Sequence, residues 1–415
     1  MKNDNYRRRS LCRLCKSSKI VSVLKLASTP PANAFVSKDK CKIEQKKYPL
    51  QLFFCESCNH VQLTDIVDPA ELFNNYVYVS GTSSVFVNHF RNYAQDIVAQ
   101  YRPSKKNYVL DIGSNDGTLL KFYKELGYSV LGIDPAKEIA KKANLDGIET
   151  INDFFNMETS KKIKEKYLNA SLITANNVFA HCDDLSGITD AVSNLLSIDG
   201  IFVFEVSYLV DVYQKTLFDT IYHEHLSYHS VIPLIGFFER KNMTLIDIVR
   251  INTHGGSIRC VVKNGLDKTK IKSSVNKLVD LENSLSFNKS DTFKDFSNQI
   301  KLRKQELKSL LKKLKSDKKK IAGFGAPAKA TTLMYEFGLD NDILDFIVDD
   351  SPLKQGLYSP GLHIPVFSSS YIEIFKPDYL LILAWNFSES IIKNNKKFLE
   401  SGGKFIIPLP TLEVI

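Results

Sequence analysis

Residues 218–230, FDTIYHEHLSYHS, hold three of the chain's eight histidines within seven positions, beside a glutamate and two tyrosines. Such a stretch can bind a metal, move a proton, or be a polar segment whose histidines are satisfied by the surrounding protein. A zinc-protease pattern needs two histidines on one helical face, but His223 and His225 directly flank Glu224 and do not share a face. A catalytic metal is therefore disfavoured. Histidine, with an ordinary pKa of about 6.5, is well suited to proton abstraction at neutral pH.

Four cysteines point to a second kind of chemistry, because they form two CxxC pairs, Cys12 with Cys15 and Cys55 with Cys58. Four thiolates arranged tetrahedrally make a closed, structural zinc site with no open position for catalysis. The segment between the pairs is longer than in a usual zinc ribbon, so an insertion around Pro30-Pro31 is required. Cys41 has no CxxC partner and is expected to be a bystander. The alternative is two unrelated pairs of free thiols.

The middle of the chain has the pattern strand, glycine turn, helix, strand. Residues 108–112 form an apolar strand that runs into the turn DIGSNDG, and TLLKFYKELG has helical periodicity and ends at Gly127. YSVLGIDP follows as a second strand that ends in Asp134. This pattern is typical of the nucleotide-binding half of a doubly wound sheet, where the terminal acid accepts hydrogen bonds from ribose hydroxyls.

Two cofactor classes share this arrangement, and the residues of the turn distinguish them. A dinucleotide site favours GxGxxG, whose glycines let the backbone approach a pyrophosphate. Here the turn carries Asp111 and Asp116, and carboxylates suit a sulfonium and an α-amino group better than a pyrophosphate. The sequence therefore favours S-adenosylmethionine over NAD. The residues predicted to bind it are Asp111, Gly113, Asn115, Asp116, Gly117, Asp134, Asp153, Phe154 and Asn176.

Another buried strand, SLITANN, contains Asn176 near its end and is followed by His181. Because ligands lie at the carboxyl ends of strands in open α/β sheets, His181 is placed where chemistry is expected, with a structural histidine as the alternative. Asp153 and Phe154 follow a shorter strand, where an acid and an aromatic ring can bracket an adenine. IFVFEVSYLVD supplies one more strand and leads into residues 218–230.

The last third repeats the strand, glycine turn and helix pattern. Residues 269–318 are rich in lysine and helix formers, and KKIAGFGAPAKATTL follows as strand, turn and helix. Lys329, with the turn amides of Gly325 and Ala326, is predicted to hold a pyrophosphate at the helix N-terminus. The alternative is that the glycines only permit a tight turn. Pro327 is compatible with a first helical turn. Arg259, in HGGSIR, alternates with apolar neighbours and faces either ligand or solvent.

Several of these motifs together resemble the sugar C-methyltransferase family, which acts on nucleotide-linked deoxy-keto sugars. The matching stretches cover essentially the whole chain: the paired CxxC motifs, DIGSNDGTLL, NNVFAH, FEVSYLVD running to FDTIYHEHLSY, HGGSIR, GFGAPAKATTL and VDDSPLKQG. The resemblance implies a carbon nucleophile. A base removes a proton from the carbon beside a ketone, C3 of a 4-keto-6-deoxy sugar, and the resulting enolate accepts the methyl group.

The resemblance also assigns residues. His225 is the implied base, Glu224 and Tyr222 bind or polarise sugar oxygens, and Tyr76 and His181 line the same site. His223 and His229 lie outside this correspondence and are expected to be structural. The implied partner is a nucleoside-diphosphate keto-sugar linked to dTDP or GDP, and the C-terminal part helps to hold its nucleotide.

Length and composition fit this organisation. A chain of 415 residues is too long for one ordinary core. We expect an α/β protein with a zinc-binding module (1–75), a doubly wound Rossmann-like methyltransferase domain (76–265) and a second Rossmann-like α/β domain (266–415). Without a membrane-length apolar run or a signal-peptide core, the chain is expected in the cytoplasm, as a monomer or a weak homo-oligomer.

Two other functions remain open from the residues alone. One is an NAD-dependent nucleotide-sugar dehydrogenase or epimerase, which the acids of the turn disfavour. The other is a zinc-ribbon methylase that binds RNA. The net charge of +9 is modest and concentrates in the lysines near residues 300–320, where no aromatic side chains are interleaved. We therefore expect no nucleic-acid partner and no membrane partner. A small anionic substrate fits the charge better.

Overall fold

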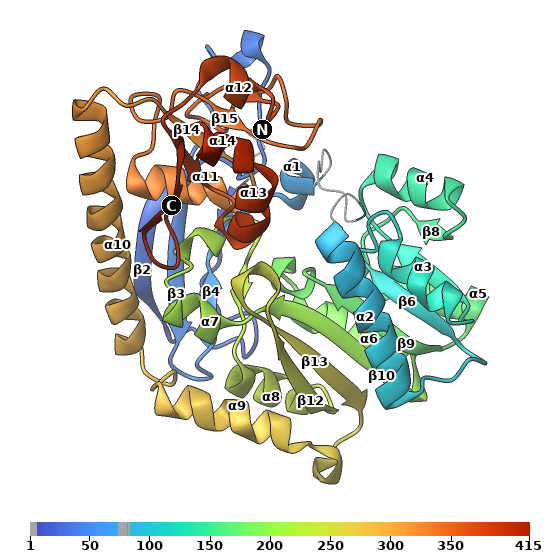
Figure 1. The fold of residues 1–415 in the computed structure, drawn as a ribbon. Helices are drawn as coiled ribbons and strands as arrows, with labels where there is room; N and C mark the ends of the chain where they lie inside the picture. The colour runs from blue at the N-terminus through green and yellow to red at the C-terminus, as the bar shows by residue number, and fades with distance from the viewer. Residues whose placement is uncertain (1–5, 74–80, 82–83) are drawn as a thin grey trace.

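The computed structural model describes residues 6–73, 81 and 84–415 (Figure 1). The N-terminal module is built on an antiparallel sheet in the order β11-β4-β3-β2, with a smaller pair, β1 and β5, beside it. In β3 buried and half-buried residues alternate, as expected of a strand with one face in the core. Its elements are β1 (Tyr6–Arg8), β2 (Ile20–Thr29), β3 (Tyr48–Cys55), β4 (Val61–Leu63), β5 (Asp65–Val67) and α1 (Pro69–Phe73).

A seven-stranded sheet in the order β12-β13-β10-β9-β6-β7-β8 forms the centre of the molecule. Strands β6 to β10 run parallel, while β13 is antiparallel to β10 and β12 is antiparallel to β13. The elements are α2 (Ser84–Tyr101), β6 (Tyr108–Ile112), α3 (Thr118–Glu125), β7 (Val130–Ile133), α4 (Lys137–Leu145), β8 (Thr150–Ile151), α5 (Met157–Tyr167), β9 (Ala170–Asn176), η3 (Phe179–His181), α6 (Leu185–Leu195), β10 (Leu196–Ser207), α7 (Leu209–Gln214), η4 (Phe218–Thr220), β11 (Ser227–Tyr228), α8 (Val231–Arg240), β12 (Met243–Ile251), η5 (Thr253–Gly255) and β13 (Ser257–Asn264).

Both faces of this sheet are covered. Helices α2 and α3 pack on one face around a core that includes Val109, Leu172 and Val203, and a second core on the other face includes Phe202 and Phe204. Burial on both faces explains why β6 is apolar along nearly its whole length. The strands predicted from the sequence here are all present. The antiparallel strand β12 was not predicted.

The C-terminal part holds a six-stranded sheet in the order β16-β15-β14-β17-β18-β19, parallel except for β19. The predicted second doubly wound unit is confirmed, and β16 and β19 are additions to it. Its elements are η6 (Lys268–Lys270), α9 (Ser273–Ser284), α10 (Asp291–Ser316), β14 (Ile321–Phe324), α11 (Ala328–Phe337), β15 (Ile347–Val348), β16 (Val366–Phe367), α12 (Tyr371–Phe375), β17 (Tyr379–Ile382), η7 (Trp385–Phe387), α13 (Ser388–Asn394), α14 (Lys396–Glu400), β18 (Lys404–Ile407) and β19 (Glu413–Val414).

Helix α10 runs along the outside of the molecule beside β2 of the N-terminal module (Figure 1). Leu307 and Leu311, four residues apart, are buried on its inner face, while Lys312 and Lys313 are exposed. The lysine-rich stretch is therefore the solvated side of an amphipathic helix. Among the described helices, none combines the length and apolarity needed to cross a membrane.

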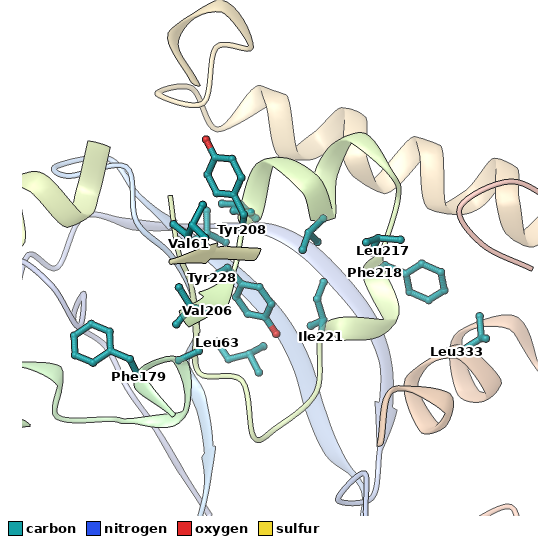
Figure 2. Close-up of a cluster of buried hydrophobic side chains, with 14 of the residues drawn as sticks. Val61, Leu63, Phe179, Val206, Tyr208, Leu217, Phe218, Ile221, Tyr228 and Leu333 are labelled. Carbon is teal, nitrogen blue, oxygen red and sulfur yellow. The ribbon is translucent and has the colours of Figure 1, made fainter. Parts of the chain in front are cut away.

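Residues 217–228 lie where the three parts meet. Strand β11 pairs with β4, placing Ser227 opposite Gln62 and Tyr228 opposite Val61. From the other side the hydroxyl of Thr332 on α11 donates to the carbonyl of Ile221 at 2.7 Å. Figure 2 shows the apolar side chains around this segment, which come from β4, η3, β10, residues 217–228 and α11. A segment predicted to belong to the central domain thus completes the sheet of the N-terminal module, and the predicted domain boundaries stay a prediction.

Candidate active site

The glycine turn after β6 depends on backbone conformations that a side chain would obstruct. Gly113 has φ +67°, and a Cβ at this position would overlap the side chain of Val178. Gly117 has φ +75°, with Ile148 at 2.9 Å from the position of a Cβ. Asn115 also lies in the left-handed region, at φ +50°. The two glycines therefore let the turn pack closely against Val178 and Ile148. Such close packing is the geometry of a nucleoside-binding turn.

Asp134 fixes this turn to the end of β7. Its two carboxylate oxygens accept hydrogen bonds from the backbone N–H groups of Asn115 and Ala136, each at 2.8 Å. Burial raises the pKa of Asp134 above its ordinary value, and the two amides counteract that shift. Beneath the turn, Asp111 accepts a hydrogen bond of 2.5 Å from the hydroxyl of Thr174, and burial raises its pKa to about 7. Both predicted acids lie at the carboxyl edge of the sheet.

Asp116 is engaged within the protein. Its carboxylate accepts hydrogen bonds from the backbone N–H and the hydroxyl of Thr118 and from the backbone N–H of Gly81. Asp116 therefore links the first residue of α3 to Gly81, before α2. Direct contact of Asp116 with a cofactor stays a prediction. Phe154 is 45% exposed, so its ring is open to stack on a ligand. Asn176 ends β9 and interacts with Tyr93 on α2.

These residues fit S-adenosylmethionine. A carboxylate at the end of the second strand, a glycine turn without side-chain obstruction and an aromatic ring beyond β8 are the features that hold a nucleoside. The acids around the turn complement the positive sulfonium and amino groups of this cofactor. Asp134, Gly113 and Phe154 would hold its adenosine part, and contacts of Asp111 and Asn176 with the cofactor stay a prediction.

Replacing Asp134 with Ala should weaken binding of S-adenosylhomocysteine by about 10- to 100-fold, because the turn amide of Asn115 loses its acceptor and the ribose loses its carboxylate. Isothermal titration calorimetry measures this directly. Asp146→Ala is the matched control, since Asp146 is exposed and its pairing with Lys121 is superficial. Equal affinity in the two variants would remove Asp134 from the cofactor site.

His225 is held in one tautomer. Its Nδ1 donates to the carbonyl of Thr220 at 2.8 Å, which leaves Nε2 as the unprotonated nitrogen, and the Tyr222 hydroxyl lies 3.0 Å from Nε2. Burial lowers the pKa of His225 to about 4. The imidazole is therefore neutral at physiological pH, with a basic nitrogen that meets a hydroxyl. The structure places the Tyr222 hydroxyl against His225, and the roles predicted for the two residues stay predictions.

The neighbours of His225 come from separate elements. The ring of His181 on η3 lies 5.0 Å from the ring of His225, centroid to centroid. His254, in the turn before β13, interacts electrostatically with both histidines. His223 and His229 are fully buried, and His223 bonds to the carbonyl of Pro49 in β3. Tyr76, predicted to line the same site, lies outside the described residues.

The side chain of Glu224 interacts with the N-terminal module and with the C-terminal unit. Its carboxylate accepts a hydrogen bond of 2.8 Å from the side chain of Asn33 in the N-terminal module. It also interacts electrostatically with Lys354 of the C-terminal unit. Burial raises the pKa of Glu224 to about 7. Sequence reasoning assigned no role to Asn33 or Lys354: Asn33 belongs to no motif, and Lys354 lies in VDDSPLKQG, far in sequence from Glu224.

The glycine turn of the C-terminal unit departs from the prediction. The backbone N–H of Gly325 donates to the carbonyl of Val348 at 2.7 Å, and that of Ala326 donates to the carboxylate of Asp349 at 2.6 Å. These amides are therefore engaged by the protein and do not form the predicted open pyrophosphate nest. Helix α11 begins after Pro327. Of the three residues predicted to bind the pyrophosphate, Lys329, Gly325 and Ala326, only Lys329 has a polar side chain that could contact a ligand.

Arg259, which the sequence left facing either ligand or solvent, forms a buried ion pair with Glu205 beneath α2. Its Nε donates to Glu205 at 2.7 Å, while Nε2 of His89 lies 2.7 Å from the other carboxylate oxygen. The guanidinium also lies over the ring of Tyr93, 4.1 Å from its centroid. Arg259 thus faces the interior under α2. No periodicity could reveal this, because it depends on the pairing of β10 with β13.

The four cysteine sulfurs come together as predicted, all within 4.8 Å of one another. Two of these contacts measure 3.5 and 3.6 Å, close to the separation of about 3.8 Å expected for thiolates around tetrahedral zinc. Cys41 lies outside the cluster, with its sulfur near the carbonyl of Ser37, and the bystander prediction holds. Elsewhere in the described residues no comparable group of metal ligands occurs, so the histidines of residues 218–230 do not form one.

Arg13, inside the first CxxC pair, connects the cysteine cluster to residues 217–228. It is fully buried and donates to the carbonyl of Leu226 at 3.0 Å and to the carboxylate of Asp183 at 3.0 Å. Leu226 in turn donates its backbone N–H to the carbonyl of Ala180 at 2.9 Å. The residues next to His225 and His181 are therefore held by the zinc module.

Comparison with known proteins follows the same three parts. Residues 12–73 match a zinc-binding domain model, residues 86–248 a methyltransferase domain model, and residues 252–410 a C-methyltransferase C-terminal domain model. Together with the sheet order and the cofactor turn, these matches define an S-adenosylmethionine-dependent methyltransferase. The NAD-dependent alternative is set aside.

The C-methyltransferase NovU of Streptomyces niveus is 33% identical over 404 residues, which cover 97% of this chain and 96% of that protein. The chain belongs to the family of S-adenosylmethionine-dependent C-methyltransferases with an N-terminal zinc-binding domain. Solved structures resemble part of the chain more distantly. A methyltransferase from Clostridium acetobutylicum (13% identity, TM-score 0.35) covers 43% of this chain and 92% of its own, and CcbJ from Streptomyces caelestis (12%, 0.34) covers 43% and 90%.

Proposed function

We propose that this enzyme methylates the carbon next to the ketone, C3, of a 4-keto-6-deoxy sugar linked to a nucleoside diphosphate. The observation that carries the proposal is the neutral imidazole of His225, with its basic Nε2 beside the Tyr222 hydroxyl. A carbon nucleophile requires removal of a C–H proton, and a ketone beside that carbon makes the proton acidic. The net charge of +9 suits an anionic substrate, and the base of the nucleotide stays a prediction between thymine and guanine.

In this proposal His225 is the base, and its neighbours bind the sugar. Nε2 of His225 takes the proton from C3, and the hydrogen bond from Nδ1 to Thr220 stabilises the imidazolium that forms. Tyr222, Glu224 and His181 supply hydrogen-bonding groups for sugar oxygens. Bound S-adenosylmethionine would supply an electrophilic methyl group for C3, leaving S-adenosylhomocysteine. His225 then returns its proton to solvent.

Incubation with methyl-labelled S-adenosylmethionine and a panel of dTDP- and GDP-linked 4-keto-6-deoxy sugars tests this function. NMR of the product should place the label on a carbon next to the ketone. In D2O with S-adenosylhomocysteine, the same sugar should exchange its C3 proton without methylation. Label on oxygen, or on no member of the panel, would contradict the proposal.

The C3 exchange rate should begin to fall on the acid side only at a pH well below 6.5, the ordinary pKa of histidine. The base is active when neutral, and since the pKa of His225 is lowered to about 4, this form is lost only as the pH falls through that value. Between pH 5 and 6 Glu224, with a pKa of about 7, is already mostly protonated, while His225 is still neutral, so we expect the C3 exchange rate per folded enzyme to stay within about twofold over this range. The fraction of folded enzyme is followed by circular dichroism at each pH. A fall of roughly 10-fold from pH 6 to pH 5 would indicate a base with the ordinary histidine pKa of about 6.5.

A further inference from the structure

Lys329 is a buried cation with a defined setting. Its side chain is only 9% exposed, and its Nζ lies 3.7 Å from the centroid of the Trp385 ring. The fully buried carboxylate of Asp219 accepts a hydrogen bond of 2.5 Å from the indole N–H of Trp385 and interacts electrostatically with Lys329. An aromatic face and a carboxylate thus stabilise the ammonium group and restrict where it can point.

The turn that carries His254 packs against the same tryptophan. A Cβ on Gly255 would lie 2.7 Å from the Trp385 ring, and one on Gly256 would overlap Asp211. His254 itself has φ +54°, a left-handed conformation that costs energy and recurs at functional sites. Its ring centroid lies 5.1 Å from that of Phe86 on α2, and it interacts electrostatically with Lys329 and with His225. Asp219, which accepts from Trp385 beside Lys329, directly precedes Thr220, whose carbonyl holds His225, so Lys329 lies on the side of the segment that carries the base.

This placement does not suit a pyrophosphate subsite. Such a subsite needs several converging donors, and the turn amides of Gly325 and Ala326 already donate to Val348 and Asp349. The ammonium group of Lys354 is bound to the carbonyl of Ala326 at 2.7 Å, whereas that of Lys329 lies near the neutral imidazole of His254. In a poorly solvated site a single fixed cation is most effective at one developing negative charge. In the proposed reaction that charge appears on the ketone oxygen.

We propose that Lys329 is the electrophilic catalyst of the reaction, donating a hydrogen bond from its ammonium group to the ketone oxygen of the sugar. This inference rests on the proposed function. As Nε2 of His225 takes the C3 proton, the C–H electron pair becomes the new C–C double bond, and the carbonyl π pair moves onto oxygen. Lys329 keeps its proton and balances the oxyanion. When C3 then takes the methyl group, the carbonyl re-forms.

The decisive variant is Lys329→Met, which keeps the length of the side chain and removes its charge. The readouts are C3 proton exchange in D2O with S-adenosylhomocysteine, at saturating dTDP- or GDP-linked keto-sugar, and calorimetric affinity for dTDP or GDP. We expect the saturated exchange rate to fall by about 100- to 1000-fold, and the nucleotide affinity to stay within about twofold. Lys312→Met, on the exposed side of α10, is the matched control.

The opposite pattern would overturn the inference. If Lys329→Met lowers affinity for the nucleoside diphosphate about 10-fold or more and keeps the saturated exchange rate, Lys329 binds the pyrophosphate. If wild-type enzyme exchanges no proton in any sugar of the panel, the proposed function itself fails, and the two failures are thus distinguished.

Trp385→Phe is a second variant for the case that Lys329→Met does not fold, as judged by circular dichroism and S-adenosylhomocysteine binding. Phenylalanine keeps an aromatic face for Lys329 but removes the indole N–H that holds Asp219. We expect the saturated exchange rate to fall by about 3- to 10-fold without a change in nucleotide affinity. An unchanged exchange rate in this variant would also contradict the inference.

Discussion

Replacing His225 with Asn should lower both methyl transfer and C3 proton exchange by about 1000- to 10,000-fold. Asparagine can keep the hydrogen bond that Nδ1 makes with the Thr220 carbonyl, but it offers no basic nitrogen where Nε2 lies. The variant therefore removes the base and retains the local fold. Because the glycine turn and Asp134 are untouched, S-adenosylhomocysteine should bind with wild-type affinity.

His223→Asn is the control for this experiment. His223 lies two residues away and is equally polar, but it is fully buried and bonds to the carbonyl of Pro49 in β3. We expect a lower melting temperature for this variant, with the exchange rate of the folded fraction within about threefold of wild type. If His225→Asn exchanges nearly as fast as His223→Asn, the proton is removed by another group.

Loss of the zinc ion should inactivate the enzyme even though the metal takes no part in the chemistry. Chelation, or the substitution Cys58→Ser, releases the CxxC pair that contains Arg13, and Arg13 holds Leu226 and Asp183. A displacement of about 1 Å at His225 is enough to cost roughly 100-fold in rate, and we expect a loss of at least that size. Zinc content, activity and melting temperature are measured on the same sample.

Cys41→Ser provides the matched thiol control, because the Cys41 sulfur lies near the Ser37 carbonyl outside the cluster. It should keep its zinc and full activity. A second variant, Arg13→Met, tests the connection itself, with zinc retained and the exchange rate lowered. Full activity in zinc-depleted protein would show that the N-terminal module does not position the catalytic segment.

Local sequence patterns were sufficient to predict much of the fold and part of the candidate site. The CxxC pairs, the turn at Gly113 and the acid at Asp134 act through short-range geometry, so their types and spacing were sufficient. His225 and Tyr222 are three residues apart in one segment, so their selection as site residues also came from a local motif, and their roles stay predictions. The fold class was predictable because buried parallel strands are apolar along their whole length.

Other features depend on tertiary contacts and leave no local signal. Strand β11 is two residues long, and nothing in its sequence indicates that it pairs with β4. The setting of Lys329 needs Trp385 and Asp219, which come from two distant segments. The predicted pyrophosphate nest failed because Asp349, at the end of the next strand, occupies the amide of Ala326. The spacing of glycines can predict a turn, but it does not show which groups accept hydrogen bonds from the backbone amides of that turn.

The attachment of residues 217–228 to all three parts has a consequence for synthesis on the ribosome. Residues 6–73 and β11 emerge early and can pair, but Thr332, which holds Ile221, and Trp385, which contacts Gly255, emerge much later. Domains generally fold in the order of their synthesis. A nascent chain can therefore bind the cofactor long before its catalytic segment is held in place. We therefore expect the enzyme to become active only after its C-terminal part has folded against this segment.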